Sequence, residues 1–308
     1  MSAATEKDEY EKLCCASCGI AGIDDIKLKD CDGCDLVKYC CDECREDRPQ
    51  HKEECKKRAA ELWDEILFRQ PESSSYGDCP ICCLPIPIDP KKSAMMTCCS
   101  KVICKGCTFA NFKREAEGRL EHKCLFCRKA LLTTKEENNE QLMKRIEAND
   151  PVAMRHMGTV IYYEGDTNAA FDYFTMAAAL GDAEAHYQLS CLYGRGEGVE
   201  KDSGKKLHHL KEAAIGGQPN ARHNLGCEEG NNGRMDRAAK HFIIAAKLGH
   251  DDSLGNVKDL YKDGLVSKDD FAAALRGHHA AIVATKSPQR EEAEKFFQSQ
   301  RLAKRKGG

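Results

Sequence analysis

The chain has 308 residues, of which 31% are charged and 6% aromatic, and its formal net charge at pH 7 is -3. Its mean hydropathy is -0.59, and no apolar run approaches the ~20 residues of a membrane helix, so no membrane association is expected. The stretch 1–9 is charged and lacks the hydrophobic core of a signal peptide. We therefore expect an intracellular protein, in the cytoplasm, the nucleus or both.

Cysteine usage is the strongest compositional signal. The chain has 20 cysteines, and all except Cys191 and Cys227 lie between Cys14 and Cys127. In a reducing compartment, cysteine pairs at C-x-x-C spacing indicate metal ligands rather than disulfides. Thiolates bound to zinc would make the net charge more negative still, which disfavours nucleic acid as a partner.

The first cysteine-rich unit, 14–58, contains four pairs of zinc ligands. Zinc binds four thiolate or imidazole ligands in a tetrahedron, so eight ligands predict two ions. The pairs are Cys15 and Cys18, Cys31 and Cys34, Cys40 and Cys44, and His51 and Cys55. Because His51 and Cys55 are four residues apart, one helix presents both on the same face.

The string Lys38-Tyr39-Cys40, followed by Cys44 and His51-Lys52-Glu53-Glu54-Cys55, resembles a MYND zinc finger. The resemblance implies interleaved sites and the binding of short peptides, often containing proline. One zinc ion would be held by Cys15, Cys18, Cys40 and Cys44, and the other by Cys31, Cys34, His51 and Cys55. Cys14 and Cys41 would be spare. Arg48 lies in the stretch where the family usually has a tryptophan, so the surface around it is expected to bind differently.

Residues 59–78 are predicted to form a helix and a linker. Leu62, Trp63, Ile66 and Leu67 recur at helical spacing within a helical stretch that begins at His51 and extends to Gln70. Pro71–Gly77 follows, with the proline, serine and glycine content of a linker.

The second cysteine-rich unit, 79–132, resembles a RING finger whose ligands are all cysteine. It reads Cys79-Pro80-Ile81-Cys82, Cys98-Cys99, Cys104, Cys107, and then Cys124, Cys127 and Arg128. The resemblance implies one zinc ion on Cys79, Cys82, Cys104 and Cys107, a second on Cys98, Cys99, Cys124 and Cys127, and a helix over 108–117. With the first unit, four zinc ions are expected.

The adjacent cysteines are the weak point of this prediction. Two neighbouring residues can share an ion only with an unusual local backbone, so His122 stays open as an alternative ligand. Cys83 is expected to be a free cysteine in the core.

In ubiquitin ligases, a RING finger docks a ubiquitin-conjugating enzyme and holds its thioester in a reactive geometry, which is catalysis by positioning. The resemblance implies that Ile81 contacts that enzyme and that Arg128 bridges it to ubiquitin. No catalytic residue is assigned. The last ligand pair encloses Leu125-Phe126 without the frequent proline, so a module that only binds proteins remains the alternative.

The third unit, 150–285, contains internal repeats. Similar segments begin at Met157, Leu189, Leu225 and Val257, at offsets of 32, 36 and 32 residues. Periods of this size predict stacked pairs of helices. An Ala-Ala pair and a glycine recur in the segments Ala177–Gly181, Ala213–Gly217, Ala245–Gly249 and Ala273–Gly277, and each glycine is predicted to end a helix in the left-handed conformation.

The segment Ala183–Val199, AEAHYQLSCLYGRGEGV, resembles a Sel-like repeat, a relative of the tetratricopeptide repeat. The resemblance extends over about Asp150 to Gly277 and implies an α-solenoid with a concave face for partners. Residues 286–308 are predicted to form a charged tail whose basic end, Arg301–Lys306, is either a solvated helix end or a nuclear localisation signal.

The predicted fold class is mainly α, with two small zinc-stabilised modules followed by an α-solenoid of helix-turn-helix repeats. The predicted function is a zinc-binding adaptor that gathers proteins or short peptides. The alternative is a RING-type ubiquitin ligase in which the MYND finger or the repeats select the substrate. Nucleic-acid binding is disfavoured by the acidic balance.

Overall fold

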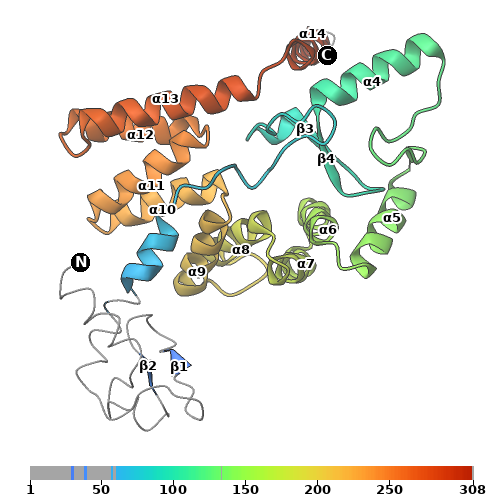
Figure 1. The fold of residues 1–308 in the computed structure, drawn as a ribbon. Helices are drawn as coiled ribbons and strands as arrows, with labels where there is room; N and C mark the ends of the chain where they lie inside the picture. Colours follow the sequence, from blue (N-terminus) through green and yellow to red (C-terminus); the bar gives the residue numbers. More distant parts are fainter. Residues whose placement is uncertain (1–28, 31–37, 40–56, 58–59, 133, 307–308) are drawn as a thin grey trace, which may run out of the picture. The chain divides into compact units, whose positions relative to one another are not determined.

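A computed structural model describes residues 29–30, 38–39, 57, 60–132 and 134–306 (Figure 1). The chain divides into two compact units, Met1–Arg69 and Gln70–Gly308. In the first unit, β1 (Lys29–Asp30) and β2 (Lys38–Tyr39) pair antiparallel, with Lys29 opposite Tyr39. Residues 60–67 are helical, as the spacing of the apolar residues predicts.

The second unit consists mainly of helices. Apart from a short 3-10 helix, η1 (Pro90–Lys92), and a β-hairpin, its described elements are α4 (Lys105–Gly118), α5 (Lys135–Glu147), α6 (Pro151–Glu164), α7 (Thr167–Ala179), α8 (Ala183–Arg195), α9 (Ser203–Ile215), α10 (Pro219–Asn231), α11 (Met235–Lys247), α12 (Asp251–Lys262), α13 (Lys268–Ala284) and α14 (Pro288–Lys306). None of the described helices is both long enough and apolar enough to cross a bilayer.

The hairpin and α4 form a small module around cysteine side chains. Strand β3 (Ser93–Met96) pairs antiparallel with β4 (Lys101–Cys104), with Ser93 opposite Cys104. The module's core contains two isoleucines among its buried cysteines: Cys79, Ile86, Ile103, Cys104 and Cys107. Helix α4 begins three residues before the predicted 108–117 and ends where Arg119 adopts a left-handed φ of 49°.

The polar stretch that begins at residue 133 contains the start of α5, a helix that the sequence analysis did not predict. The Thr134 side chain accepts from the Glu137 backbone N–H, and the Glu137 side chain accepts from the Thr134 N–H. This reciprocal cap satisfies two of the unpaired donors at the helix start.

The repeats form four consecutive helix pairs, α6–α7, α8–α9, α10–α11 and α12–α13. A side chain before the first helix of each pair caps that helix by accepting from its backbone N–H groups: Asp150, Asp182, Gln218 and His250. The preceding glycines, Gly181, Gly217 and Gly249, have φ values of 82°, 81° and 94°, as predicted. The prediction for Gly277 was wrong, because α13 continues to Ala284.

Within two of the repeats, a glycine on the first helix faces a phenylalanine on the second. A Cβ added at Gly158 would lie 2.9 Å from Phe174 Cε1, and one at Gly226 would lie 2.5 Å from Phe242 Cε1. At the equivalent positions of the α8–α9 pair, the chain has Ser190 and Leu210, which are 2% and 1% exposed. Where the first helix has serine instead of glycine, the second helix has leucine instead of the larger phenylalanine, as close packing requires.

The cysteine module lies along the inter-repeat turns. The Ser75 N–H donates to Gly217 O at 3.0 Å, and Thr97 Oγ1 donates to Asn138 Oδ1 of α5 at 2.7 Å. Ile88 reaches the turn at Gly249, and α14 packs against α4 (Figure 1). The segment 71–77 has no regular secondary structure, but these contacts tie it and the module to the repeats.

Candidate metal centres

The first candidate centre consists of Cys79, Cys82, Cys104 and Cys107, whose Sγ atoms all lie within 4.8 Å of one another. The Sγ atoms of Cys79 and Cys107 are 3.9 Å apart, and those of Cys82 and Cys104 are 3.8 Å apart. A tetrahedron with Zn–S bonds of about 2.3 Å has S–S edges of about 3.8 Å. The four thiols therefore fit a zinc ion, and they lie too far apart for a disulfide.

The local backbone brings these ligands together. A bridge between Asp78 and Pro85 closes the loop that carries Cys79 and Cys82, while Cys104 ends β4 and Cys107 lies in the first turn of α4. The Cys104 N–H donates to Cys79 Sγ at 3.5 Å. Burial raises the pKa of Cys79, but the backbone N–H groups of Cys104, Cys82 and Ile81 outweigh it and lower the pKa to about 7. Such N–H donors favour the thiolate that a metal needs.

The second candidate centre consists of Cys98, Cys99, Cys124 and Cys127, again with all Sγ atoms within 4.8 Å. The Cys99 and Cys124 Sγ atoms are 3.8 Å apart, and those of Cys98 and Cys127 are 3.3 Å apart. The adjacent cysteines reach one site because the chain turns tightly after β3. The N–H groups of Cys99 and Ser100 both donate to Met96 O, at 3.2 and 2.8 Å, and Ser100 has a left-handed φ of 56°.

His122, the alternative ligand, lies outside this cluster. Its Nδ1 is 2.6 Å from Glu115 Oε2, and Glu115 is buried at 3% exposure. Burial raises the pKa of Glu115, but hydrogen bonds from Asn111, His122 and the Lys123 N–H lower it below its usual value. His122 therefore pairs with a structural carboxylate. Cys83 is exposed, so the expectation of a core cysteine was wrong.

The structure thus brings the eight cysteines of the second module into the two groups that the resemblance implies. Within the described residues, Cys191 and Cys227 join neither group. The MYND-like ligands lie outside the described residues: Cys15, Cys18, Cys31, Cys34, Cys40, Cys44, His51 and Cys55. Ile81, between the first two ligands, is 39% exposed, and Arg128, directly after the last ligand, is also exposed.

Sequence analysis missed a residue beside the first centre. Arg290 of α14 donates from Nη2 to Cys82 Sγ at 3.4 Å, across 208 residues of chain. A lone arginine in a charged tail carries no spacing signal that could pair it with a cysteine so far away.

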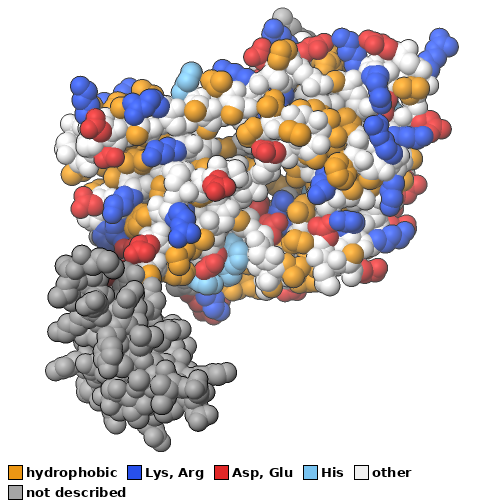
Figure 2. All heavy atoms as spheres, viewed as in Figure 1, with side chains coloured by type: hydrophobic (Ala, Val, Ile, Leu, Met, Phe, Trp, Pro, Cys, Tyr) orange, Lys and Arg blue, Asp and Glu red, His pale blue; other side chains and the backbone are white. Residues whose placement is uncertain are grey.

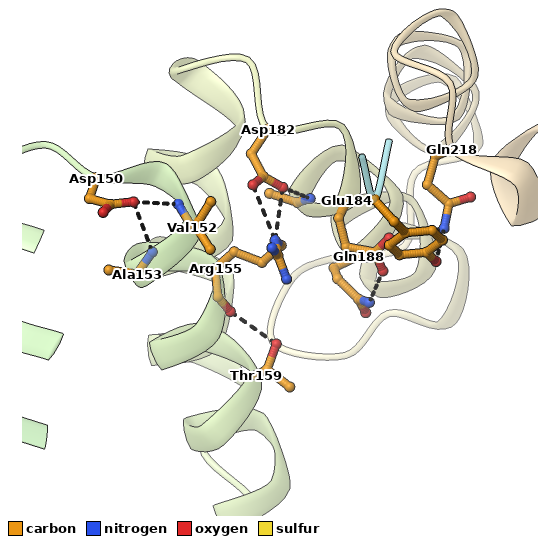
Figure 3. A network of polar contacts seen from close by, with 11 residues as sticks. Asp150, Val152, Ala153, Arg155, Thr159, Asp182, Glu184, Gln188 and Gln218 are labelled. Atoms are coloured by element: carbon orange, nitrogen blue, oxygen red, sulfur yellow. Dashed lines mark hydrogen bonds and ion pairs between the residues drawn. The ribbon is translucent and has the colours of Figure 1, made fainter. Parts of the chain in front are cut away.

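A second unpredicted contact ties the module to the repeats at Gln218, which lies beside Glu184 (Figure 3). Gln218, fully buried, donates from Nε2 to Tyr76 Oη at 3.2 Å and to Glu184 Oε2 at 3.0 Å. Burial and then the negative charge of Glu184 raise the pKa of Tyr76 well above its usual value. In the neighbouring repeat, Arg155 pairs with the capping residue Asp182 (Figure 3). Gln218, by contrast, replaces a capping aspartate with an amide that also binds Tyr76.

The fold and the clustered thiols define a mainly α protein in which small zinc modules precede an α-solenoid. Comparison with known families agrees. Residues 15–55 match the MYND finger family, a zinc-binding domain, and residues 151–182, 183–217 and 219–250 match the Sel1 repeat family. Three of the four helix pairs are therefore confirmed as Sel1 repeats, and zinc is confirmed as the cofactor type. The second cysteine module matches no family that these comparisons report.

Two solved structures are similar to part of the chain. One is a protective antigen of uropathogenic Escherichia coli strains that displays an SLR fold, at 30% identity and a TM-score of 0.40, with 48% of this chain and 33% of that chain covered. The other is a Sel1 repeat protein from Oxalobacter formigenes, at 22% identity and a TM-score of 0.43, with 53% and 49% covered. The matches thus span a third to a half of those proteins. No curated protein matches the chain.

Proposed function

We propose that the protein is a zinc-dependent adaptor in which the Sel1 repeats and the second cysteine module act as one body. The observation that carries this proposal is a set of contacts at three places. Ser75 and Tyr76, which lead into the module, bond to Gly217 and Gln218 of a repeat turn. Thr97 bonds to α5, which packs on α6, and α14, which follows the last repeat, packs on α4. A module tied to successive repeats presents its own surface in a fixed relation to theirs. The MYND finger adds a separate binding site at the other end of the chain.

The ligand sets belong to this proposal. Four zinc ions are expected, two on the MYND ligands from Cys15 to Cys55 and two on the clusters that begin at Cys79 and Cys98. Elemental analysis of the purified full chain should find about four zinc ions, by the ligand count. Cys79→Ser and Cys124→Ser should each remove one ion, and the matched controls Cys83→Ser and Cys191→Ser should remove none. About two ions in the wild type would leave one module without metal.

The module exposes apolar side chains next to its ligands. Ile81 is 39% exposed, Phe126 is 46% exposed and Phe112 is 50% exposed, and the Lys101 ammonium lies 5.5 Å from the centre of the Phe126 ring. Exposed aromatic and branched residues of this kind are typical of protein–protein contacts. On the face drawn in Figure 2, acidic and basic side chains are interspersed without a large patch of one sign. Proteins or peptides thus suit this surface better than nucleic acid.

An adaptor must hold two partners at once. We expect affinity capture with the full chain to recover one set of proteins that is lost with Cys40→Ser, in the MYND finger, and another that is lost with Ile81→Ala/Phe126→Ala. The matched control is Met235→Ala on α11, which is 40% exposed. If each of the two variants loses all of the captured proteins, or if neither variant loses any, the chain does not bridge separate partners.

A RING-type ubiquitin ligase is the second candidate, because Ile81 and Arg128 are both exposed beside the two candidate zinc centres. In this function Ile81 contacts the ubiquitin-conjugating enzyme and Arg128 holds ubiquitin against it. An in vitro assay with a panel of conjugating enzymes tests the idea. Activity should fall in Ile81→Ala and Arg128→Ala and persist in Cys191→Ser. If no enzyme in the panel yields ubiquitin chains with the zinc-loaded wild type, the adaptor function stands alone.

A further inference from the structure

The C-terminal helix α14 inserts one side chain beside the first zinc centre. The guanidinium of Arg290 donates from Nη1 to Pro85 O at 2.7 Å and to Thr285 O at 2.9 Å. It donates from Nη2 to Leu84 O at 3.1 Å and to Cys82 Sγ at 3.4 Å. Three of these four acceptors belong to the loop that carries Cys82, so Arg290 binds both the ligand and the backbone that positions it.

Beyond Arg290, α14 packs against α4 of the module. The Phe109 ring of α4 packs against Phe296 at 4.7 Å and Phe297 at 6.0 Å between ring centroids. The helix comes close because α4 has Gly106, where an added Cβ would lie 2.7 Å from Arg290 Cγ. The Lys105 ammonium lies 5.2 Å from the centre of the Phe297 ring, and Gln289 Oε1 lies 4.0 Å from Cys107 Sγ. Salt bridges between exposed side chains, such as Lys113 with Glu292 at 3.2 Å, add little.

A cavity of about 880 Å³ borders this contact, lined among others by Lys105, Gly106, Arg290 and Phe297. The helix is therefore not packed on all sides. Its docking on the module depends on these contacts with α4 and on the bonds of Arg290.

With zinc bound, the first centre is negatively charged. Four thiolates around Zn²⁺ carry a net charge of -2, which the positive charge of Arg290 partly balances. A thiolate is also a stronger hydrogen-bond acceptor than a thiol, and bonds between charged groups are stronger than neutral ones. The ion would also fix Cys82, and the carbonyls of Leu84 and Pro85, which accept from Arg290, follow Cys82 in the same loop. Loss of the ion therefore frees the loop that holds Arg290.

We propose that Arg290 is a positioning residue for the first zinc centre and that α14 is a metal-dependent latch, docked on the module while zinc is bound and released when it is lost. The proposal rests on zinc binding at Cys79, Cys82, Cys104 and Cys107, as proposed above. Arg290 slows the loss of that ion, and by linkage the ion stabilises the docked helix. Release exposes Phe109, Phe296 and Phe297.

Zinc transfer to a chromophoric chelator from the full-length protein tests the first half of the proposal. Replacing a residue that supports a metal ligand typically weakens metal affinity about 10–100-fold. We expect one ion to transfer at least about tenfold faster in Arg290→Gln than in the wild type, with the other ions unchanged. Arg290→Lys keeps the charge but cannot make four bonds, so its rate should lie between the two. Arg276→Gln on α13, at an exposed position, should match the wild type.

Hydrogen exchange of the amides of α14 tests the second half, first in the wild type and then in Arg290→Gln. Removing zinc from the wild type should speed exchange in α14 more than in α12, and Arg290→Gln should show faster exchange with zinc still bound. The proposal is wrong if the ion transfers at the wild-type rate from Arg290→Gln and Arg290→Lys. It is also wrong if the exchange rates of the α14 amides are the same with and without zinc. If instead Cys79→Ser leaves the zinc content unchanged, the zinc centre itself is not where we place it.

Discussion

The close contact between Gly226 and Phe242 predicts that the single methyl group added by Gly226→Ala overpacks the repeat. A Cβ at residue 226 would lie 2.5, 2.7 and 2.9 Å from three ring carbons of Phe242, whereas carbon atoms pack at about 3.5–4.0 Å. Phe242 is 7% exposed, so its ring has little room to move. Overpacking of this kind costs about 1–3 kcal/mol, and Gly→Ala in a helix interior regains about 1 kcal/mol.

Gly255 of α12 is the matched control, because nothing lies within 4 Å of a Cβ added there. Gly255→Ala should stabilise the repeats by up to about 1 kcal/mol. Gly226→Ala should be less stable than Gly255→Ala by about 1–3 kcal/mol. Urea unfolding of the zinc-loaded full chain, followed by helical circular dichroism, compares the midpoints.

A double-mutant cycle then asks whether Phe242 is the cause. Leucine occupies the equivalent position in the α8–α9 pair, where the small residue is Ser190. Phe242→Leu should therefore make room, and Gly226→Ala/Phe242→Leu should recover at least about 1 kcal/mol relative to the sum of the single changes. Equal stabilisation by the two alanines, or strictly additive effects, would refute the packing argument.

Three further predictions concern other contacts. Burial, and then the charge of His186, lowers the pKa of His209 from 6.5 to about 4, and burial and then His223 do the same to His250. Between these pH values the unfolded chain binds more protons than the folded chain. As the pH is lowered from about 6.5 to 4, the free energy of unfolding should therefore fall by roughly 1.4 kcal/mol per pH unit for each histidine. Unfolding midpoints across this range should show a shallower slope in His209→Gln but not in the exposed control His279→Gln. Tyr76→Phe leaves the buried Gln218 amide short of a partner and should cost about 1–3 kcal/mol, whereas Tyr163→Phe, at an 83% exposed residue, should change the midpoint by less than about 0.5 kcal/mol. Chelation of zinc should unfold the module and also lower the unfolding midpoint of the repeats, since Ser75 bonds to the repeat turn at Gly217 and Thr97 bonds to α5, which packs on α6; an unchanged midpoint of the repeats would contradict this coupling.

Local features of this fold could be predicted from sequence, because the spacing of the ligands and the repeats is itself local. The inter-repeat glycines follow from a pattern a few residues long, and the helix between Cys107 and Cys124 was implied by the resemblance to a RING finger. Gly277 shows where such a pattern fails. The same Ala-Ala-x-x-Gly string occurs there inside a helix, where a Cβ would lie 2.7 Å from Lys247 Cγ, so the glycine serves a close approach rather than a cap.

The parts that sequence reasoning missed depend on contacts between distant residues. Thr134 and Glu137 did carry a local signal, the capping box, which could have revealed α5. Tyr76 with Gln218 and Arg290 with Cys82 carried none, because a single chain shows no pairing between residues 142 or 208 positions apart. The choice between Cys98 and His122 also needed the three-dimensional path of the backbone, in particular the turn at Ser100.

The separation of Cys82 and Arg290 along the chain has a consequence for biosynthesis. The ribosome adds about 5–20 residues per second, so roughly 10–40 s pass between the two residues. During that interval the zinc ion proposed for the first centre would be held without the guanidinium that later binds beside it. Nascent chains that still lack α14 would then lose the metal most readily. A chain truncated before α14 would keep this property permanently.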